Sequence, residues 1–270
     1  MKRIFTFWEP KENIPAYIKL CMQTWYKFLP DYEIVVLDYE NLRDWIRPET
    51  YNAIVFKRMS LAKQSDALRA ALLNEHGGIW LDADTIITGN DFITRNPNAD
   101  VIMIGRPKTD GVIYGAFIYA AHAHTAFISE WYNALPRRIA KYRFMYKHKI
   151  IRKFMKSAWR AAENWDYCVN AIIDKLGKKY TVPDFYCIDR DDIGALPEYQ
   201  SPLNVDNIDK AELYKRFYFE PGNAKSVLKN THGIILLHNS WTPANYRNMT
   251  EKQFMSQNIL LTNILKELLK

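Results

Sequence analysis

The sequence predicts an α/β fold in which a mostly parallel central sheet is flanked by helices, with a basic helical insert. Short apolar runs, such as residues 32–38, alternate along the chain with segments whose apolar residues recur at helical spacing, such as residues 14–28. The runs are apolar throughout instead of alternating with polar residues, which is typical of strands buried on both faces. This order of strands and helices indicates a parallel sheet covered by helices on both sides.

Each predicted element follows from its own pattern of apolar, capping and breaking residues. The expected strands are residues 3–8, 32–38, 79–81, 101–105, 112–120, 181–189 and 234–237. The expected helices are residues 14–28, a short one around 42–46, one that follows Ser60, residues 126–135, the insert at 137–160, residues 164–176 and a C-terminal helix opened by the capping box Thr250-x-x-Gln253. Residues 190–232 show little periodicity and are expected to form loops around a cleft.

The pattern is centred on the stretch SLAKQSDALRAALLNEHGGIWLDADT. Ser60 can cap a helix, because its hydroxyl accepts a hydrogen bond from a free N–H group of the first turn. Gly77 and Gly78 are expected to end that helix, since glycine adopts the left-handed conformation without a Cβ penalty. Asp82 and Asp84 follow an apolar strand at alternate positions, so their side chains are expected to point the same way. Two carboxylates at a strand end suit a hard divalent cation that also binds substrate phosphates.

A bare D-x-D pair is a weak signal, and the chain contains a second one at Asp189 and Asp191. The longer pattern, S-D-x-x-R followed by G-G-I-W-L-D-x-D, is more specific. Over roughly 26 residues it resembles the core of the glycosyltransferase family whose sugar-binding region contains the DXD motif. That family is akin to capsular polysaccharide synthesis transferases and to the glucosylating domains of large clostridial toxins. The resemblance implies a GT-A-like, Rossmann-like fold and a metal-dependent hexosyltransferase that retains the anomeric configuration.

The resemblance also implies a role for each residue of the motif. Asp82 and Asp84 would hold Mn²⁺ or Mg²⁺ and, through it, the diphosphate of a nucleotide sugar, for which UDP-galactose or UDP-glucose is expected. Asp66 and Arg69 match family positions that hold the sugar ring and steady the phosphate, and a planar guanidinium suits such paired contacts. These four residues form the expected catalytic set. Trp8, at the end of the first strand, would stack on the base, with a structural place at the edge of the core as its alternative.

A second motif, His238-Asn239-Ser240-Trp241, follows the strand expected at residues 234–237. Related transferases end their catalytic core with a His or Asn metal ligand, followed by Ser and Trp that contact the diphosphate. Imidazole can complete a manganese site that carboxylates begin, and a hydroxyl and an indole N–H are donors for phosphate oxygens. His238 is therefore expected as the third metal ligand, with Asn239 as the open alternative. Ser240 and Trp241 are expected to bind the diphosphate.

The net charge of +7 is concentrated in one segment. Residues 141–160 contain eight Lys or Arg and no acidic residue, so the remainder of the chain sums to −1. A basic helix with an apolar face can lie in the headgroup region of an anionic leaflet, whereas the plainer alternative is a solvated helix packed on the domain. If this segment is helical, four apolar residues lie near one face: Phe144, Ile151, Met155 and Trp159. Nucleic acid is not an expected partner, because the basic cluster lacks a recognised binding motif.

Length and composition favour one domain over residues 1–270, with the insert at 137–160 and the C-terminal helix at 250–270. Three cysteines are too few and too scattered for a disulfide framework or a zinc site, which fits a reducing compartment. No apolar run has the length of a transmembrane helix. The expected location is the cytoplasm, with peripheral contact at the inner face of the membrane.

The expected acceptor is a glycan or a polyprenyl-diphosphate-linked glycan of bacterial surface or capsular polysaccharide synthesis. Two alternatives remain open. Residues 79–86, IWLDADTI, copy the nucleophile motif of haloacid-dehalogenase-type phosphatases, although that motif normally opens its domain. In such an enzyme Asp82 would be the nucleophile and Asp84 the acid/base. The other alternative is a carbohydrate- or membrane-binding module without catalysis, which predicts nucleotide binding that is absent or independent of metal.

Overall fold

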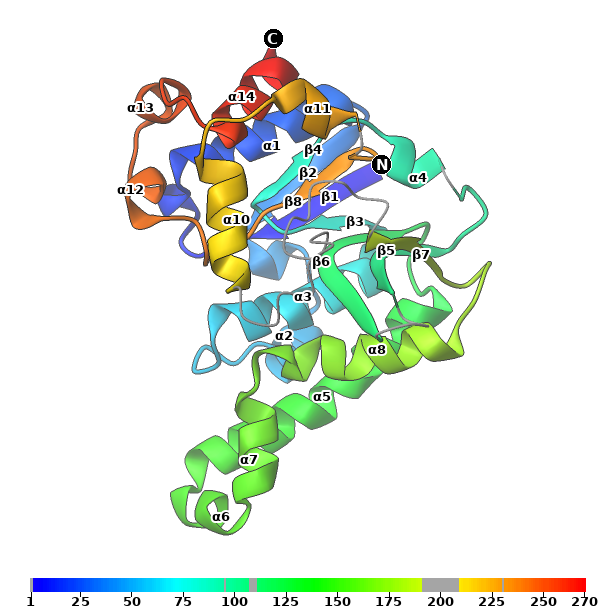
Figure 1. Ribbon diagram of the computed structural model, residues 1–270. Helices are drawn as coiled ribbons and strands as arrows, with labels where there is room; N and C mark the ends of the chain where they lie inside the picture. Colours follow the sequence, from blue (N-terminus) through cyan, green and yellow to red (C-terminus); the bar gives the residue numbers. More distant parts are fainter. Residues whose placement is uncertain (1, 95, 107–110, 191–208, 230) are drawn as a thin grey trace.

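The computed structural model describes residues 2–94, 96–106, 111–190, 209–229 and 231–270. In this part of the chain, six strands form a central sheet in the order β2-β1-β3-β6-β5-β7 (Figure 1). The strands are β1 (Lys2–Phe7), β2 (Tyr32–Leu37), β3 (Gly78–Leu81), β5 (Val101–Arg106), β6 (Val112–Ala120) and β7 (Tyr186–Asp189). β1 pairs in parallel with β2 and β3, and β5 with β7, whereas β6 is antiparallel to both of its neighbours. The predicted α/β fold with a mostly parallel sheet is confirmed.

Helices lie on both sides of this sheet (Figure 1). Those before the insert are α1 (Ala16–Phe28), α2 (Pro48–Ile54), α3 (Leu61–His76) and α4 (Asp91–Thr94), with short 3-10 turns η1 (Lys11–Asn13) and η2 (Leu42–Asp44). Those that follow are α5 (Ala126–Lys147), α6 (Lys149–Phe154), α7 (Lys156–Glu163), the 3-10 turn η3 (Trp165–Cys168), α8 (Asn170–Lys179), α10 (Lys210–Phe219), α11 (Ala224–Leu228), α12 (Ala244–Arg247), α13 (Glu251–Met255) and α14 (Leu260–Leu269). None of the helices in the described ranges is long and apolar enough to span a membrane.

The sheet separates two hydrophobic cores, because successive residues of its strands point to opposite faces. Ile79 and Leu81 of β3 contribute to the core that includes α1 and α14, whereas Trp80 between them belongs to the core that includes α3, α5 and α8. All three side chains are fully buried. This burial on both faces explains why the strand is apolar at every position.

The helix–glycine–strand unit forms as predicted. The Ser60 hydroxyl accepts a hydrogen bond from the backbone N–H of Lys63 at 3.5 Å, and α3 ends at Gly77, which has φ +65°. A Cβ at Gly77 would lie 2.7 Å from the backbone of His122, and one at Gly78 would lie 2.6 Å from the carbonyl oxygen of Arg3. Both positions therefore require glycine, for the positive φ and for the close approach of neighbouring backbone.

A second, two-stranded sheet joins distant parts of the sequence. β4 (Thr85–Ile87) pairs antiparallel with β8 (Ile234–Leu236), so Thr85 lies opposite Leu236. Trp25 of α1 donates a hydrogen bond from its indole N–H to the Thr85 carbonyl at 2.7 Å, which holds β4 against the helix. This pairing places the segment after β8 beside the turn between β3 and β4.

Several element predictions were wrong in extent. The insert is helical but not continuous, because α5 runs past Pro136 to Lys147 and is followed by the separate helices α6 and α7. The helix expected at residues 164–176 is the turn η3 followed by α8, and the strand expected at 181–189 is present only as β7. The C-terminal helix is divided into α13 and α14, although its capping box at Thr250 and Gln253 is confirmed.

The loops expected at residues 190–232 include two helices, α10 and α11. Tyr214 and Tyr218 of α10 are fully buried, and both belong to the core that includes α1 and α14. Their spacing of four residues is helical, but a pair of tyrosines within a charged segment is a weak periodic signal. Residues 191–208 of this region lie outside the described part of the chain.

Candidate active site

A cavity of about 850 Å³ opens where β1 and β3 end. In an open α/β sheet, ligands bind outside the carboxyl ends of the strands. All of the residues expected at a site line this cavity: Trp8, Asp66, Arg69, Asp82, Asp84, His238, Asn239, Ser240 and Trp241. The structure thus brings together residues from β1, α3, the turn after β3 and the segment after β8.

The two D-x-D carboxylates lie in a turn and not on a strand. β3 ends at Leu81, the Asp82 N–H donates to the carbonyl of Ala116 at 2.8 Å, and the Thr85 N–H donates to the carbonyl of Asp82 at 2.9 Å. Asp82 and Asp84 therefore follow β3, as expected, but the alternation of side chains along a strand does not extend to them. Both nevertheless line the cavity, because the chain turns between β3 and β4.

The Arg69 guanidinium bridges Asp66 and Asp82, two of the three acidic residues of the motif. Its Nη2 lies 3.0 Å from Asp66 Oδ1 and 3.1 Å from Asp82 Oδ1, and its Nη1 donates to the carbonyl of Gly115. The guanidinium carbon lies 5.1 Å from the centroid of the Trp80 ring, whose indole N–H donates to Asp82 Oδ1 at 2.8 Å. These contacts hold the buried guanidinium in one place.

Asp66 is a buried carboxyl whose ionisation is finely balanced. Burial raises its pKa to about 7, although the neighbouring Arg69 cation opposes the shift. Near neutral pH both protonation states are therefore populated. Such a carboxyl can accept a hydrogen bond from a ligand hydroxyl and, when protonated, donate one as well.

Asp84 is half-buried, and its carboxylate is bound by a residue far along the chain. Its Oδ2 accepts the backbone N–H of Asn239 at 2.6 Å. Burial, and then the charge of Asp82, raise the pKa of Asp84 to about 7, against the opposing charge of His238. A divalent cation bound at the two carboxylates would offset their repulsion and favour the ionised form.

Neighbouring side chains of the segment after β8 have different partners. The Asn239 side-chain oxygen accepts the hydroxyl hydrogen of Tyr17, while the His238 ring packs on Trp241 with ring centroids 4.1 Å apart. The backbone N–H of His238 donates to the Tyr214 hydroxyl at 3.2 Å. The Asn239 oxygen is therefore already bound to a buried tyrosine, and both His238 and Asn239 line the cavity.

The donor set fits a metal that binds together with a substrate. Among the residues that the structure describes, no group of three or more His, Cys, Asp or Glu side chains is arranged to hold a metal ion. Asp82 and Asp84 do provide two neighbouring carboxylates, and Mg²⁺ is commonly bound by one or two carboxylates together with substrate phosphates. The arrangement therefore suits a cation completed by phosphate oxygens better than a metal centre assembled by the protein alone.

Three residues of the site's surroundings had no predicted role in the sequence analysis. Tyr17 and Tyr214 support the segment after β8, and Gly115 leaves room for the Arg69 guanidinium. The tyrosine contacts join positions more than 20 and more than 200 residues apart. No local signal could have revealed them, since they depend on the pairing of β4 with β8.

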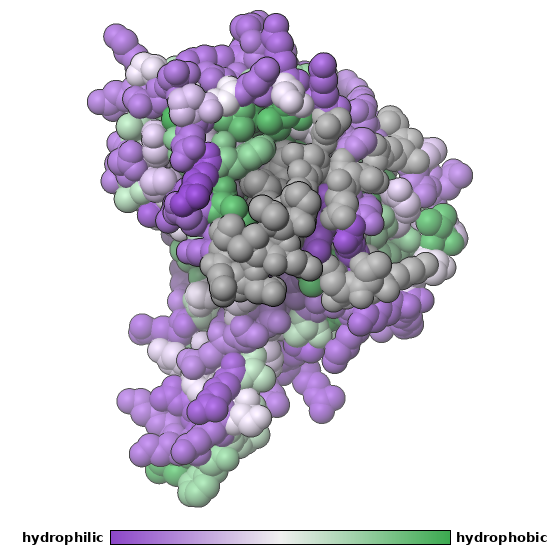
Figure 2. Space-filling model, viewed as in Figure 1, coloured by the Kyte–Doolittle hydropathy of each residue, from purple (hydrophilic) through white to green (hydrophobic). Residues whose placement is uncertain are grey.

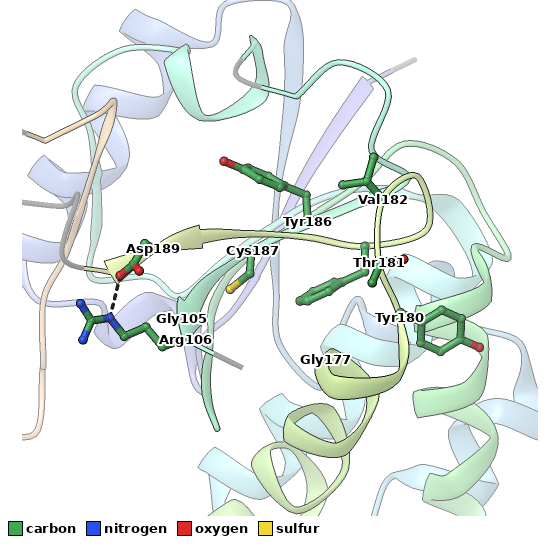
Figure 3. A pocket seen from close by; sticks show the side chains of 10 residues that line it. Gly105, Arg106, Gly177, Tyr180, Thr181, Val182, Tyr186, Cys187 and Asp189 are labelled. Atoms are coloured by element: carbon green, nitrogen blue, oxygen red, sulfur yellow. Dashed lines mark hydrogen bonds and ion pairs between the residues drawn. The ribbon is translucent and has the colours of Figure 1, made fainter. Parts of the chain in front are cut away.

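A second cavity, of about 420 Å³, lies between β5, β7 and the end of α8 (Figure 3). Its lining includes Asp189, the first carboxylate of the second D-x-D pair, which forms an ion pair with Arg106 at 2.8 Å. None of the expected site residues lines it, and Asp191 lies outside the described residues. The two D-x-D pairs are therefore in different surroundings.

Replacing Gly115 should disturb the site through Arg69. A Cβ at this position would lie 2.7 Å from Arg69 Nη1 and 3.0 Å from Val169 Cγ2, so Gly115→Ala forces the guanidinium to move. We expect a loss of about 1–3 kcal/mol in the free energy of unfolding, measured by chemical denaturation. Gly89→Ala is the matched control, because its Cβ would meet atoms only at 3.8 and 3.9 Å. Equal destabilisation by both substitutions would contradict the crowding at Arg69.

The raised pKa of Asp84 predicts a pH dependence of stability in the metal-free protein. Between the ordinary pKa of 3.8 and about 7, the folded state binds the proton more tightly than the unfolded state does. Stability should therefore fall as the pH rises through this range. Asp84→Asn, which cannot titrate, should reduce the slope of the unfolding midpoint against pH when chelator is present. An unchanged slope would show that Asp84 does not titrate in this range.

Comparison with known proteins identifies the family. Residues 1–182 match the family model described as capsular polysaccharide synthesis protein. No curated protein matches the chain by sequence. One similar solved structure is the glycosyltransferase GlyE of Streptococcus pneumoniae TIGR4, at 12% identity and a TM-score of 0.46, covering 98% of this chain and 62% of GlyE. Another is an active-site mutant of LgtC, at 10% identity and a TM-score of 0.37, covering 94% of each chain. The chain spans less than two thirds of the GlyE chain. Because the matched residues make up more than half of its length, this protein belongs to the capsular polysaccharide synthesis protein family.

Proposed function

We propose that this protein is a metal-dependent glycosyltransferase that moves a hexose from a nucleotide sugar to a glycan in capsular polysaccharide synthesis, with UDP-galactose or UDP-glucose as the donor. The observation that supports this most is the cavity itself. Paired carboxylates, a fixed Arg–Asp pair and a His-Asn-Ser-Trp segment line one space at the end of the parallel strands. These are the groups needed to hold a diphosphate and a sugar ring side by side.

The donor would be held at three points. Asp82 and Asp84, with His238 as a third ligand, would hold Mn²⁺ or Mg²⁺ against the diphosphate, and Ser240 and Trp241 would donate hydrogen bonds to phosphate oxygens. Trp8, which follows β1 at the edge of the cavity, would stack on the base. When bound, the metal supplies positive charge that stabilises the leaving diphosphate.

Arg69 is best placed as a positioning residue. In addition to Asp66, Asp82 and Gly115, its Nε and Nη2 donate to the carbonyl and hydroxyl of Ser65 at 3.5 and 3.3 Å. A guanidinium with so many partners is better suited to orienting Asp66 towards the sugar and Asp82 towards the metal than to releasing them for a phosphate. Asp66 would then contact the sugar hydroxyls directly.

We propose retention of the anomeric configuration, with the leaving phosphate taking the acceptor proton, so that no side chain is assigned as the base. The proposed acceptor is a glycan or a polyprenyl-diphosphate-linked glycan. Contact of residues 141–160 with the inner face of the membrane would bring the enzyme to a lipid-linked acceptor, and would place it in the cytoplasm.

The phosphatase alternative fits the same residues less well. Asp82 Oδ1 accepts the Trp80 indole N–H and pairs with Arg69, so one oxygen of the carboxylate is held by a cation, which lowers its nucleophilicity. β1 and β2 also precede the motif, whereas such phosphatases begin with it. Both observations favour a role for Asp82 in holding a charged ligand.

Nucleotide binding should depend on metal. We expect calorimetric titration with UDP to give binding in the presence of Mn²⁺ and little without it. In Asp82→Asn/Asp84→Asn the affinity should fall by at least about a hundredfold, because two direct ligands of the metal are lost. Asp189→Asn, in the second D-x-D pair, is the matched control and should bind UDP as the wild type does.

Metal-independent UDP binding would favour the non-catalytic module. Absence of binding to UDP and to other nucleotides, together with hydrolysis of sugar phosphates, would favour the phosphatase.

Asp66→Ala should abolish transfer while the protein stays folded. The substitution removes a buried carboxyl, and Arg69 keeps its ion pair with Asp82. We expect UDP release from UDP-galactose or UDP-glucose to slow by at least about a hundredfold, because contacts to the sugar in the transition state are lost. UDP binding and circular dichroism should be unchanged. Near-normal turnover in this variant would contradict the assigned role.

A further inference from the structure

The insert forms an arm that projects from the body of the protein. Figure 1 shows α5 leaving the sheet region, with α6 and α7 at its far end, and both short helices pack on α5. In Figure 2 hydrophobic side chains gather at the end of this arm, with hydrophilic ones around them. We call residues 144–156 the arm tip.

The arm tip exposes large apolar side chains. Phe154 is 86% exposed and Ile150 is 72% exposed, and the two lie four residues apart on one face of α6. Phe144 and Met155 are 48% and 40% exposed. α6 contains no buried residue, and a helix of six residues is not stable by itself in water. Packing within the protein therefore does not account for this apolar face.

A basic stripe runs beside the apolar one. Lys149 and Lys153 are exposed and four residues apart, so they share a neighbouring face of α6. Lys147 and Lys156 extend the exposed charge at both ends, and residues 141–160 contain no acidic residue. The tip therefore combines an apolar ridge with an uninterrupted positive surface.

The inner side of the arm is well packed, so the exposed face is a built feature. Trp159 packs against Tyr142, with ring centroids 5.2 Å apart, and the Arg152 guanidinium lies 4.8 Å from the Trp159 ring. Lys63 of α3 donates to the carbonyl of Glu163 at 2.7 Å. Of the four residues expected near one face of this segment, Ile151 and Trp159 are half-buried, whereas Phe144 and Met155 are exposed. The free face of α6 consists of Ile150 and Phe154.

We propose that the arm tip inserts Ile150 and Phe154 into the headgroup region of an anionic lipid bilayer, where the lysine stripe meets the lipid phosphates. Charge complementarity identifies the partner, since an apolar ridge within a purely basic surface matches acyl chains below a layer of anionic headgroups. An acidic protein surface would match the lysines but would leave the two most exposed apolar side chains in water.

The arm also connects the proposed membrane-binding tip to the cavity of the candidate site. α7 leads from the tip to η3, where Trp165 is 67% exposed and lines the cavity. At 1.5 Å per residue, α7 spans about 12 Å. One short helix thus connects the arm tip to the lining of the cavity, which suits an acceptor whose glycan is attached to a lipid. This last step rests on the proposed function, whereas insertion of the tip does not.

Flotation with vesicles tests the insertion on the full-length protein. We expect wild type to float with phosphatidylcholine vesicles that contain phosphatidylglycerol and to stay in solution with phosphatidylcholine alone. Ile150→Ala/Phe154→Ala should lower the partition coefficient roughly tenfold or more through the lost apolar area. Lys149→Glu/Lys153→Glu should lower it by a similar factor, and added salt should weaken wild-type binding. Tyr26→Ala is the matched control, because Tyr26 is 60% exposed on α1 in the body of the protein.

Wild-type affinity in either arm variant, or failure of the wild type to float with anionic vesicles at low salt, would overturn the proposal. UDP titration on the same samples separates it from the proposed function, because none of the substituted residues lines the cavity. A protein that floats but binds neither UDP nor another nucleotide would support the insertion of the arm tip and contradict the transferase. A protein that binds UDP but does not float would support the transferase and contradict the insertion of the arm tip.

Discussion

The antiparallel pairing of β4 with β8 is the constraint on which the candidate site depends. Thr85 of β4 lies opposite Leu236 of β8, so the pairing joins the turn that follows β3 to a segment about 150 residues further along the chain. Trp25 fixes the same strand to α1 through the Thr85 carbonyl. Because Asn239 follows β8 by only a few residues, its backbone N–H reaches the Asp84 carboxylate. This small sheet is therefore what brings the Asp82–Asp84 motif and the His238–Trp241 motif together.

Three carboxyl groups, those of Asp66, Asp82 and Asp84, dominate the electrostatics of the candidate site. Asp66 is buried and Asp84 is half-buried, and Asp82 lies close enough to both to raise their pKa values. The Arg69 guanidinium forms ion pairs with Asp66 and Asp82. Burial of a carboxylate without full compensation is costly, and the raised pKa values of Asp66 and Asp84 express that cost. A ligand that brings positive charge to Asp84 would relieve it. The raised pKa values of Asp66 and Asp84 therefore mark this cluster as the place where an added positive charge would be most favourable.

What could be predicted from the sequence was what local physics determines. The cap at Ser60, the glycine end of α3 and the buried strand before Asp82 each depend on neighbours within a few residues, and all three are present. The gathering of the candidate residues was anticipated from a motif resemblance, and not from the spacing of the residues. The conformation at Asp82–Asp84, the support by Tyr17 and the inward packing of Trp159 depend on contacts between distant elements, so no local pattern indicated them.

The family model matches only part of the chain, and the candidate site also uses residues outside that part. The matched region stops at residue 182, before β8 and the segment that follows it. Yet His238, Ser240 and Trp241 line the cavity with the motif residues, and Tyr214 of α10 supports them through the His238 backbone. The matched part therefore contains both carboxylates but only one side of the cavity. Closing the other side requires the unmatched part to fold onto α1, which the burial of Tyr214 and Leu261 in the shared core accomplishes. The contribution of this region to the site is therefore a strand that pairs with β4 and the polar side chains directly after that strand.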